Sequence, residues 1–252
     1  MKKIAFVFCF LACISIIDAQ EHFPVNGVVS KFKPIYAFTH AEIHVNAKTT
    51  ISDATLLVQG NKILGVGNKV SIPKDAIVKD LKGKHIYPGF IDLYSSYGIP
   101  AVKKSIWSPR PQITSSKTGA FGWNEAIHPE INAVENFTND EKSAKELRAL
   151  GFTTVLTHQQ DGIMRGTGAL INLTDESEVH AVLNTQTAAF YSFQKGSSRQ
   201  NYPSSLMGSI ALLKQTYMDA QWYKSNKGIT DLSLTALNSS LDLPQIFEAD
   251  DK

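Results

Sequence analysis

The chain has few cysteines, and its mature part is expected to have none. Cys9 and Cys13 both fall within residues 1–19, which begin with Lys2-Lys3, continue as an apolar stretch and end at the small residue Ala19. This pattern is typical of a secretory signal peptide cleaved after Ala19. Cleavage would leave no residue able to form a disulfide, a thiolate metal site or a cysteine nucleophile.

Long hydrophobic runs are also missing beyond the signal segment. No later apolar run approaches the roughly 20 residues that span a bilayer, so no transmembrane span is predicted after cleavage. We expect export to the periplasm or the extracellular space. A lipid anchor at Cys13 is the weaker alternative, because residues 10–13 match a lipoprotein signal poorly.

The chain lacks an excess of charge of one sign. It has 25 Lys and Arg against 23 Asp and Glu, a net charge of +2, and no basic block. A nucleic-acid-binding surface normally shows as a clustered basic patch, so nucleic acid is not an expected partner. With 252 residues, 43% of them hydrophobic, the chain is long enough to bury a sizeable core.

Residues 20–84 are predicted to form a small β domain. Residues 41–45 alternate between apolar and polar side chains, and residues 54–58 and 63–66 form a hairpin pattern around Gly60. With a further short strand near Ile77, these segments predict an antiparallel sheet or half of a sandwich. His40 and His44 are four residues apart, a spacing that does not bring side chains together in a strand, so no metal site is predicted there.

From His85 onward the pattern changes to alternating strands and helices. A buried strand is expected from Phe90 to Asp92, after the turn residues Pro88-Gly89. A long loop follows over residues 99–137, and then a helix over residues 138–150 with Thr138 as its N-cap. The strand predicted for residues 152–156 completes a helix-to-strand unit typical of βα folds.

The remaining segments predict further strands and helices. The glycine-rich residues 161–168 fit neither the dinucleotide fingerprint nor the P-loop spacing, and are interpreted as a tight turn before a strand at residues 169–173. A strand is also predicted for residues 179–183. We expect helices over residues 205–226 and after Asp231, and a last short strand within residues 243–248.

Three segments together resemble the entrance of the amidohydrolase superfamily, in its imidazolonepropionase-like branch. They are residues 57–67 (LVQGNKILGVG), 80–84 (DLKGK) and 87–92 (YPGFID). The resemblance implies an α/β fold in which a composite β-sandwich domain precedes a (β/α)8 TIM-like barrel. It also implies hydrolysis of amide or other carbon–nitrogen bonds, usually in rings, by water that one or two divalent ions such as zinc activate.

The same stretch departs from the family at its metal ligands. The family's first barrel strand ends in Asp-x-His-x-His, whereas this chain has Asp92, then Tyr94 and Ser96. A neutral phenol and a neutral hydroxyl are poor zinc ligands. Tyr94 and Ser96 are therefore interpreted as degenerate metal-ligand positions, and the sequence predicts no catalytic residue, metal or other cofactor in this chain.

The barrel is expected to be incomplete. Residues 85–252 are fewer than the about 200 to 250 residues that an eight-unit barrel takes. The chain is thus expected to be the N-terminal part of a longer polypeptide, whose C-terminal part would be its first partner. The ligands that the resemblance implies from later strands should lie beyond residue 252.

Two further residues are candidates for the barrel mouth. Asp92 could accept hydrogen bonds from backbone amides or orient a substrate. His158 follows the strand of residues 152–157, at an end where parallel strands carry functional groups, but without a partner at metal spacing a structural or solvent-facing role is the alternative.

Three functional hypotheses follow. The chain is part of an exported amidohydrolase-like enzyme, or an inactive pseudo-amidohydrolase module for binding or scaffolding, or a structural secreted β-rich domain. In the second case, aromatic side chains between Trp107 and Trp123 could contact a small molecule, peptide or glycan.

Overall fold

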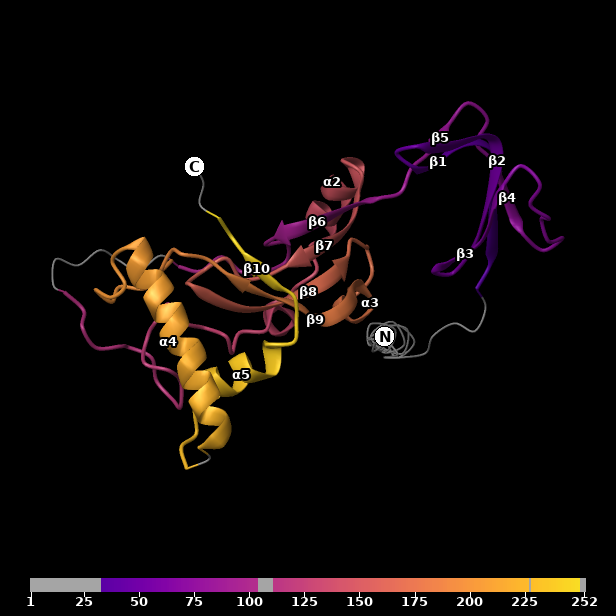
Figure 1. The fold of residues 1–252 in the computed structure, drawn as a ribbon. Helices are drawn as coiled ribbons and strands as arrows, with labels where there is room; N and C mark the ends of the chain where they lie inside the picture. Colours follow the sequence, from indigo (N-terminus) through magenta and orange to yellow (C-terminus); the bar gives the residue numbers. More distant parts are fainter. Residues whose placement is uncertain (1–32, 104–110, 227, 250–252) are drawn as a thin grey trace, which may run out of the picture. The chain divides into compact units, whose positions relative to one another are not determined.

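A computed structural model of the chain describes residues 33–103, 111–226 and 228–249. These residues form two compact units, and the chain passes from one to the other between Pro88 and Gly89 (Figure 1). The predicted signal peptide, residues 1–19, lies outside the described residues. Within them, no helix combines the length and apolarity needed to cross a membrane.

The smaller unit is one five-stranded sheet. Four strands lie in the order β3-β2-β1-β4, and β5 also pairs with β1. The strands are β1 (Ile35–Asn46), β2 (Thr49–Gln59), β3 (Lys62–Gly67), β4 (Ile77–Asp80) and β5 (His85–Ile86). The hairpin predicted around Gly60 is confirmed as the antiparallel pair β2 and β3. The expectation of a wholly antiparallel sheet is wrong, because β4 and β5 pair with β1 in parallel.

A small core stabilises this sheet. Ala41, Ile43 and Ala54 are buried, and other apolar side chains from β2, β5 and the segment after β4 pack against them. Alternation along β1 directs Ala41 and Ile43 into this core. Glu42 and His44 therefore project from the opposite face.

The larger unit contains a second five-stranded sheet in the order β10-β9-β8-β7-β6. Its strands are β6 (Phe90–Ser95), β7 (Phe152–Thr157), β8 (Met164–Asn172), β9 (Val182–Tyr191) and β10 (Gln245–Phe247). β6 and β7 are parallel, as are β9 and β10, but β8 runs antiparallel to both of its neighbours. The sheet is therefore mixed.

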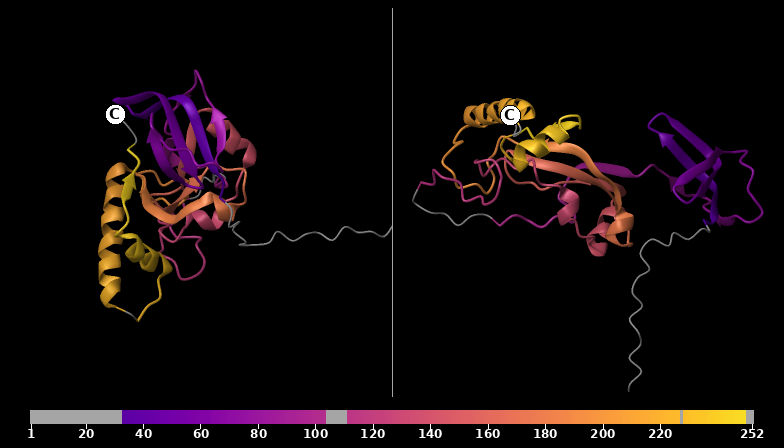
Figure 2. Two further views of the ribbon diagram at one scale, coloured as in Figure 1. Left: turned by 90° about the vertical axis from the view of Figure 1, so that its right-hand side faces the viewer. Right: turned by 90° about the horizontal axis from the view of Figure 1, so that it is seen from below.

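Helices lie on both sides of this sheet (Figure 2). They are the 3-10 helix η2 (Ala133–Asn136) and the α-helices α2 (Glu141–Ala149), α3 (Glu178–Ala181), α4 (Leu206–Ser225) and α5 (Leu232–Ser240). The helix predicted for residues 205–226 is confirmed as α4, and Asp231 caps α5 by accepting the N–H of Leu234 at 2.9 Å.

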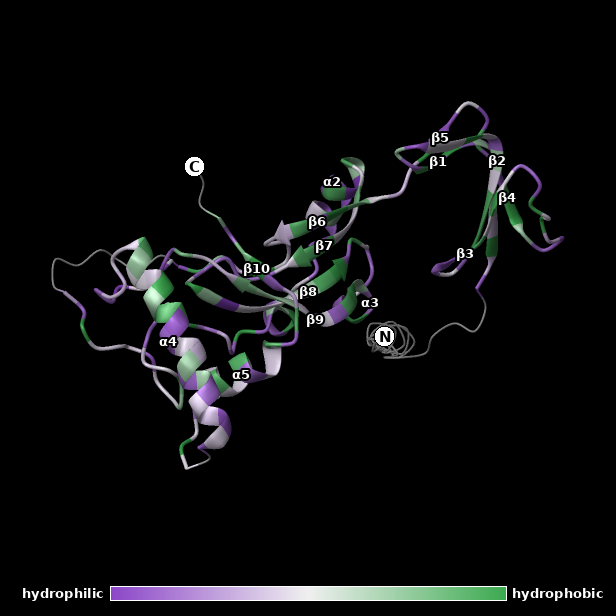
Figure 3. Cartoon of the chain, viewed as in Figure 1, coloured by the Kyte–Doolittle hydropathy of each residue, from purple (hydrophilic) through white to green (hydrophobic). Residues whose placement is uncertain are grey.

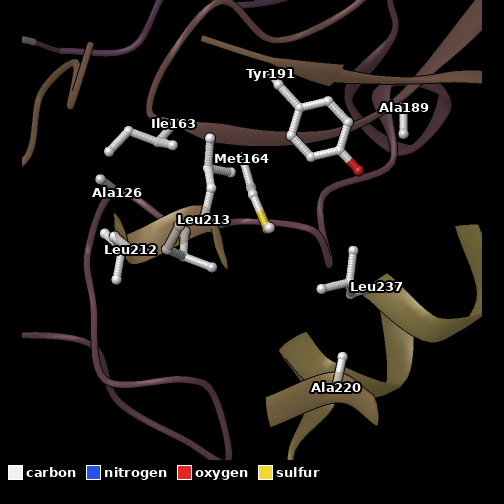
Figure 4. Packing of buried hydrophobic residues seen from close by; sticks show 10 residues of the cluster. Ala126, Ile163, Met164, Ala189, Tyr191, Leu212, Leu213, Ala220 and Leu237 are labelled. Carbon is white, nitrogen blue, oxygen red and sulfur yellow. The ribbon is translucent and has the colours of Figure 1, made fainter. Parts of the chain in front are cut away.

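The packing between helices and sheet forms two main cores in this unit. Leu212 and Leu213 of α4 and Leu237 of α5 pack with Met164 and Tyr191 of the sheet (Figure 4). A second core joins η2 and α2 to β7 and β8. Figure 3 shows hydrophobic residues concentrated along β7 and β8, whereas α4 alternates between hydrophobic and hydrophilic residues.

The glycine-rich segment is a strand for most of its length and not the turn that the sequence predicts. β8 begins at Met164, and Gly166 has φ +77° with the Ile131 carbonyl oxygen so near that a Cβ would lie 1.9 Å from it. A Cβ on Gly168 would lie 2.5 Å from the ring of Phe190. These glycines permit close approach of neighbouring segments within the sheet.

Three other local expectations need correction. Residues 178–181 are the short helix α3, and the strand predicted at 179–183 starts only at Val182. The N-cap of α2 is Asp140 and not Thr138. The strand that begins at Phe90 is at a sheet edge and not buried, since Ile91 is 57% and Leu93 62% exposed.

Candidate functional site

The parallel strands β6 and β7 bring two of the four candidate residues together. Tyr94 lies on β6, His158 directly follows β7, and their rings meet edge to face with centroids 4.8 Å apart. Asp92 Oδ1 accepts the backbone N–H of Tyr94 at 2.9 Å, so this carboxylate holds a backbone amide of its own strand. Ser96 comes just after β6 and is exposed.

His158 is buried and not solvent-facing. Its ring is 0% exposed and stacks on Phe190 of β9, with centroids 3.7 Å apart and planes 6° from parallel. Neither ring nitrogen has a hydrogen-bond partner among the described residues. Burial, together with the nearby positive charge of Arg165, lowers the pKa of His158 to about 3, so the imidazole is neutral at pH 7.

Arg165 is the charged group at the centre of this site. It comes from β8, is 6% exposed, and its Nη1 donates to the phenol oxygen of Tyr94 at 2.8 Å. Its Nη2 forms an ion pair with Glu248 Oε2 at 2.7 Å, and its Nε donates to the Gly162 carbonyl at 3.1 Å. Burial, and secondarily Glu248, raise the pKa of Tyr94, which keeps the phenol neutral.

Arg165, Phe190 and Glu248 are site residues that the sequence interpretation missed. One signal was available for Arg165, since it is the single charged side chain in the apolar and glycine-rich run 162–171. An arginine in a buried strand normally requires an acidic partner. Nothing near Arg165 in the sequence identifies that partner as Glu248.

The residues at this site do not fit a divalent metal ion. A guanidinium group lies within hydrogen-bonding distance of Tyr94, the position where the resemblance implies a histidine ligand, and its positive charge repels a cation. In residues 89–103, 111–226 and 228–249, no three His, Cys, Asp or Glu side chains are close enough to share an ion. Among these described residues, His158 thus belongs to no cluster of three such ligands.

The long loop after β6 forms a separate, polar cleft of about 560 Å³. Its walls include Lys103, Lys117, Glu125 and Arg199. The aromatic residues expected to bind a ligand do not line it where the structure describes them. Trp123 instead lies beside Tyr202, with ring centroids 6.3 Å apart, and Trp107 falls outside the described residues.

Comparisons with known proteins bear on the fold of the chain. No protein-family model and no curated protein matches the chain. The crystal structure of an amidohydrolase from Thermotoga maritima MSB8 matches with a TM-score of 0.65 at 22% identity, and covers 85% of this chain and 58% of that one. A prolidase complexed with N-methylphosphonate-L-proline matches with a TM-score of only 0.27, at 16% identity, over 48% of this chain and 25% of its own.

The likeness to the Thermotoga protein supports the part of the expectation that concerns the fold. The chain spans 58% of the length of that protein, and the matched portion is a mixed α/β arrangement with two sheets. At 22% identity such a likeness describes the backbone and not the chemistry. The chain therefore has an amidohydrolase-like fold.

Proposed function

We propose that this chain is part of a hydrolase of the amidohydrolase kind, acting on non-peptide carbon–nitrogen bonds such as those of cyclic amides. The observation that carries the proposal is the fold likeness to the Thermotoga amidohydrolase over 85% of the chain. The three entrance segments that resemble the imidazolonepropionase-like branch support the same function. The hydrolytic step belongs to a completed barrel, to which a longer polypeptide contributes.

The site around Tyr94 is proposed to bind and orient substrate, and not to activate water. The Tyr94 phenol is 37% exposed, neutral, and held in place by Arg165. A neutral hydroxyl in a fixed position can donate a hydrogen bond to a substrate carbonyl. The buried, neutral ring of His158 packs edge to face against Tyr94 and stacks on the buried ring of Phe190. These two rings hold the Tyr94 ring in place.

Hydrolysis assays test the enzymatic proposal. The chain alone and the polypeptide encoded by its complete reading frame would be given a panel of five- and six-membered cyclic amides, and carboxylate release would be followed by pH-stat. We expect hydrolysis that requires a divalent ion from the longer polypeptide only. A longer polypeptide that binds these amides without hydrolysing them would favour the pseudo-amidohydrolase module instead.

Substitution of Tyr94 tests the role of the site. In the active polypeptide, Tyr94→Phe removes one hydrogen bond to substrate, so we expect KM to rise about tenfold with little change in kcat. Leu93→Met, at the exposed neighbouring position, is the matched control and should change neither constant. A loss confined to kcat would contradict the proposed role in substrate binding.

We also propose that the protein is exported through residues 1–19, which have the charge and hydropathy pattern of a signal peptide. Mass spectrometry of the exported protein should give a mature N-terminus at Gln20. A mature protein that begins at a lipid-modified Cys13 would show the lipoprotein alternative, and an uncleaved cytoplasmic protein would contradict export.

A further inference from the structure

The smaller unit gathers three metal-ligating side chains that lie far apart in the sequence. Glu42 and His44 project from one face of β1, because Ala41 and Ile43 face the core. β5 lies beside β1 (Figure 1) and pairs with it in parallel. The register places His85 opposite Glu42 and Ile86 opposite Ile43. His85 therefore lies on the same face as Glu42 and His44.

The three ligand atoms have the spacing of one face of a coordination tetrahedron. His44 Nε2 lies 3.1 Å from His85 Nδ1 and 3.4 Å from Glu42 Oε1, and His85 Nδ1 lies 3.5 Å from the same oxygen. Ligands about 2.0 to 2.2 Å from a tetrahedral zinc ion are separated from one another by roughly 3.3 to 3.6 Å. An ion can therefore contact all three atoms with little movement of the side chains.

Neighbouring residues hold His44 in the orientation that a metal requires. The Thr50 hydroxyl, directly across the strand pair on β2, lies 3.0 Å from His44 Nδ1. The ring of Tyr87 stacks on the His44 ring, with centroids 4.2 Å apart and planes 6° from parallel. The Thr50 hydroxyl can accept a hydrogen bond from a protonated Nδ1, and in that tautomer the Nε2 lone pair is free for a cation, with Thr50 in the role of an outer-shell partner.

We propose that Glu42, His44 and His85 bind one zinc-type divalent cation in the β domain, with solvent as the fourth ligand. Two imidazoles and one carboxylate favour zinc and similar transition ions over magnesium or calcium, which prefer oxygen ligands. The side chains of Glu42 and His85 are 40% and 49% exposed, so a solvent ligand has access. The alternative is a direct hydrogen bond between the two imidazoles, with no bound ion.

The position of the site suggests what the ion does. It would link β1 to β5 across 41 residues of sequence, in a unit whose core cluster has three buried residues among those that the structure describes. Small domains with limited cores are commonly stabilised by a metal ion. The proposal is independent of the proposed hydrolase function, and it departs from the sequence-based expectation that this chain holds no metal.

Zinc binding to the tag-free full chain tests the proposal directly. After dialysis against a chelator, the protein is titrated with zinc in competition with a chromophoric chelator. We expect one equivalent to bind, and His44→Ala or His85→Ala to weaken binding by about 100-fold or more, since each removes a direct ligand. Thr50→Val, which keeps the β-branched shape, should weaken it by about 10-fold through loss of the hydrogen bond.

His40→Ala is the matched control. His40 lies on the same strand but is paired with Asp80 at 3.0 Å, so its removal should leave the affinity for zinc unchanged. A second measurement needs no variant: zinc added to the wild-type chain should shift the imidazole NMR signals of His44 and His85 and not that of His40.

Three results would overturn the proposal. They are the absence of a stoichiometric zinc equivalent, unchanged affinity in the His44→Ala/His85→Ala double variant, and zinc-induced shifts confined to other histidines. The double variant also separates this site from the one around Tyr94. A tight equivalent retained by the double variant would show that zinc binds elsewhere in the chain and would overturn the assignment to Glu42, His44 and His85, whereas the assays of amide hydrolysis test the proposed function separately.

Discussion

At the scale of single residues, His158 is the most unusual side chain of the larger unit. It is a buried imidazole between two aromatic rings, and neither of its nitrogens is paired among the described residues. A buried polar group without a partner costs about 1–3 kcal/mol of stability. Its place at the end of β7 therefore lowers the stability of the fold.

His158 predicts a specific pH dependence of stability. Its pKa is about 3 in the folded state against about 6.5 in an unfolded chain, so the unfolded state binds the proton more readily between these values. Its contribution to stability is present above about pH 6.5 and is lost as the pH falls toward 3. His158→Phe removes the group that binds this proton and keeps an aromatic ring to stack on Phe190.

We expect the free energy of unfolding of His158→Phe, measured in urea, to rise relative to that of the wild type by on the order of 2–3 kcal/mol when the pH falls from 7 to 4. His180→Phe, at an exposed histidine, is the control and should show a much smaller change over this interval. Parallel pH profiles of His158→Phe and the wild type would show that His158 is accessible to protons in the folded state.

Glu130 is a second residue whose ionisation is coupled to folding. Burial alone would raise its pKa, but the hydrogen bond from His128, the charge of Lys117 at 3.1 Å and a hydrogen bond from Ser233 lower it to about 2. The stabilisation is complete above the ordinary pKa of about 4.5 and is lost as the pH falls to 2.

Glu130→Gln should therefore destabilise the protein by on the order of 3 kcal/mol at pH 7 and by much less at pH 2.5, measured by urea unfolding. The exposed Glu146→Gln is the matched control, for which a change within about 0.5 kcal/mol is expected. An equal cost of Glu130→Gln at both pH values would show that the ion pair with Lys117 and the hydrogen bond with His128 do not form.

At the scale of elements, the start of α2 separates local signals from tertiary ones. Both Thr138 and Asp140 are acceptable N-cap residues, and the capping-box pattern favours Thr138. In the structure the N-cap is Asp140, whose side chain accepts hydrogen bonds from the backbone N–H groups of Lys142 and Ser143. Its backbone N–H meanwhile donates to the Tyr97 hydroxyl, 43 residues away.

The two cap assignments make opposite predictions. Asp140→Ala should cost about 1 kcal/mol because it removes the cap acceptor, whereas Thr138→Ala should cost almost nothing, since Thr138 is exposed. Chemical denaturation of both variants at pH 7 decides between them. A larger loss from Thr138→Ala would restore the cap predicted from sequence.

The contacts of β8 with neighbouring segments explain why the glycine-rich residues form a strand and not a turn. Gly162, Gly166 and Gly168 are consistent with a turn when only residues 161–168 are considered. The carbonyl of Ile131 and the ring of Phe190 explain two of these glycines, and both come from distant segments. The antiparallel direction of β8 likewise depends on β7 and β9, and no local pattern encodes it.

At the scale of the whole molecule, the division between Pro88 and Gly89 predicts two unfolding events. Each unit has its own buried apolar cluster, around Ile43 in the smaller one and around Leu237 in the larger. We expect Ile43→Ala and Leu237→Ala each to reduce the free energy of unfolding of their own unit by about 2–5 kcal/mol. Each substitution should therefore lower the temperature of one thermal transition and not of the other. Calorimetry in the presence of a chelator should resolve the two transitions.

A single transition that both substitutions shift equally would contradict this division, because it would require the two clusters to unfold cooperatively. Zinc offers an internal check on the assignment. If the β-domain site exists, added zinc should raise only the transition that Ile43→Ala lowers, by mass action on the folded smaller unit.

The sequence by itself determined the features that depend on neighbouring residues. It predicted the hairpin around Gly60, the long helix α4, the Asp231 cap and the family resemblance carried by residues 57–92. That resemblance also implies that Tyr94 and Ser96 stand where the family has two histidines, which stays a prediction. These features are local because capping, turn formation and side-chain periodicity act within a few residues.

Only the tertiary structure decided which distant groups meet. The ion pair joins Arg165 on β8 to Glu248, which directly follows β10, and the cluster of Glu42, His44 and His85 depends on parallel pairing of β1 with β5. The spacing of His40 and His44 along one strand does not bring their side chains together. His44 instead lies beside His85, which comes from the neighbouring strand β5. Contacts of this kind depend on strand order and register, which result from packing the whole unit and are not encoded by any short segment.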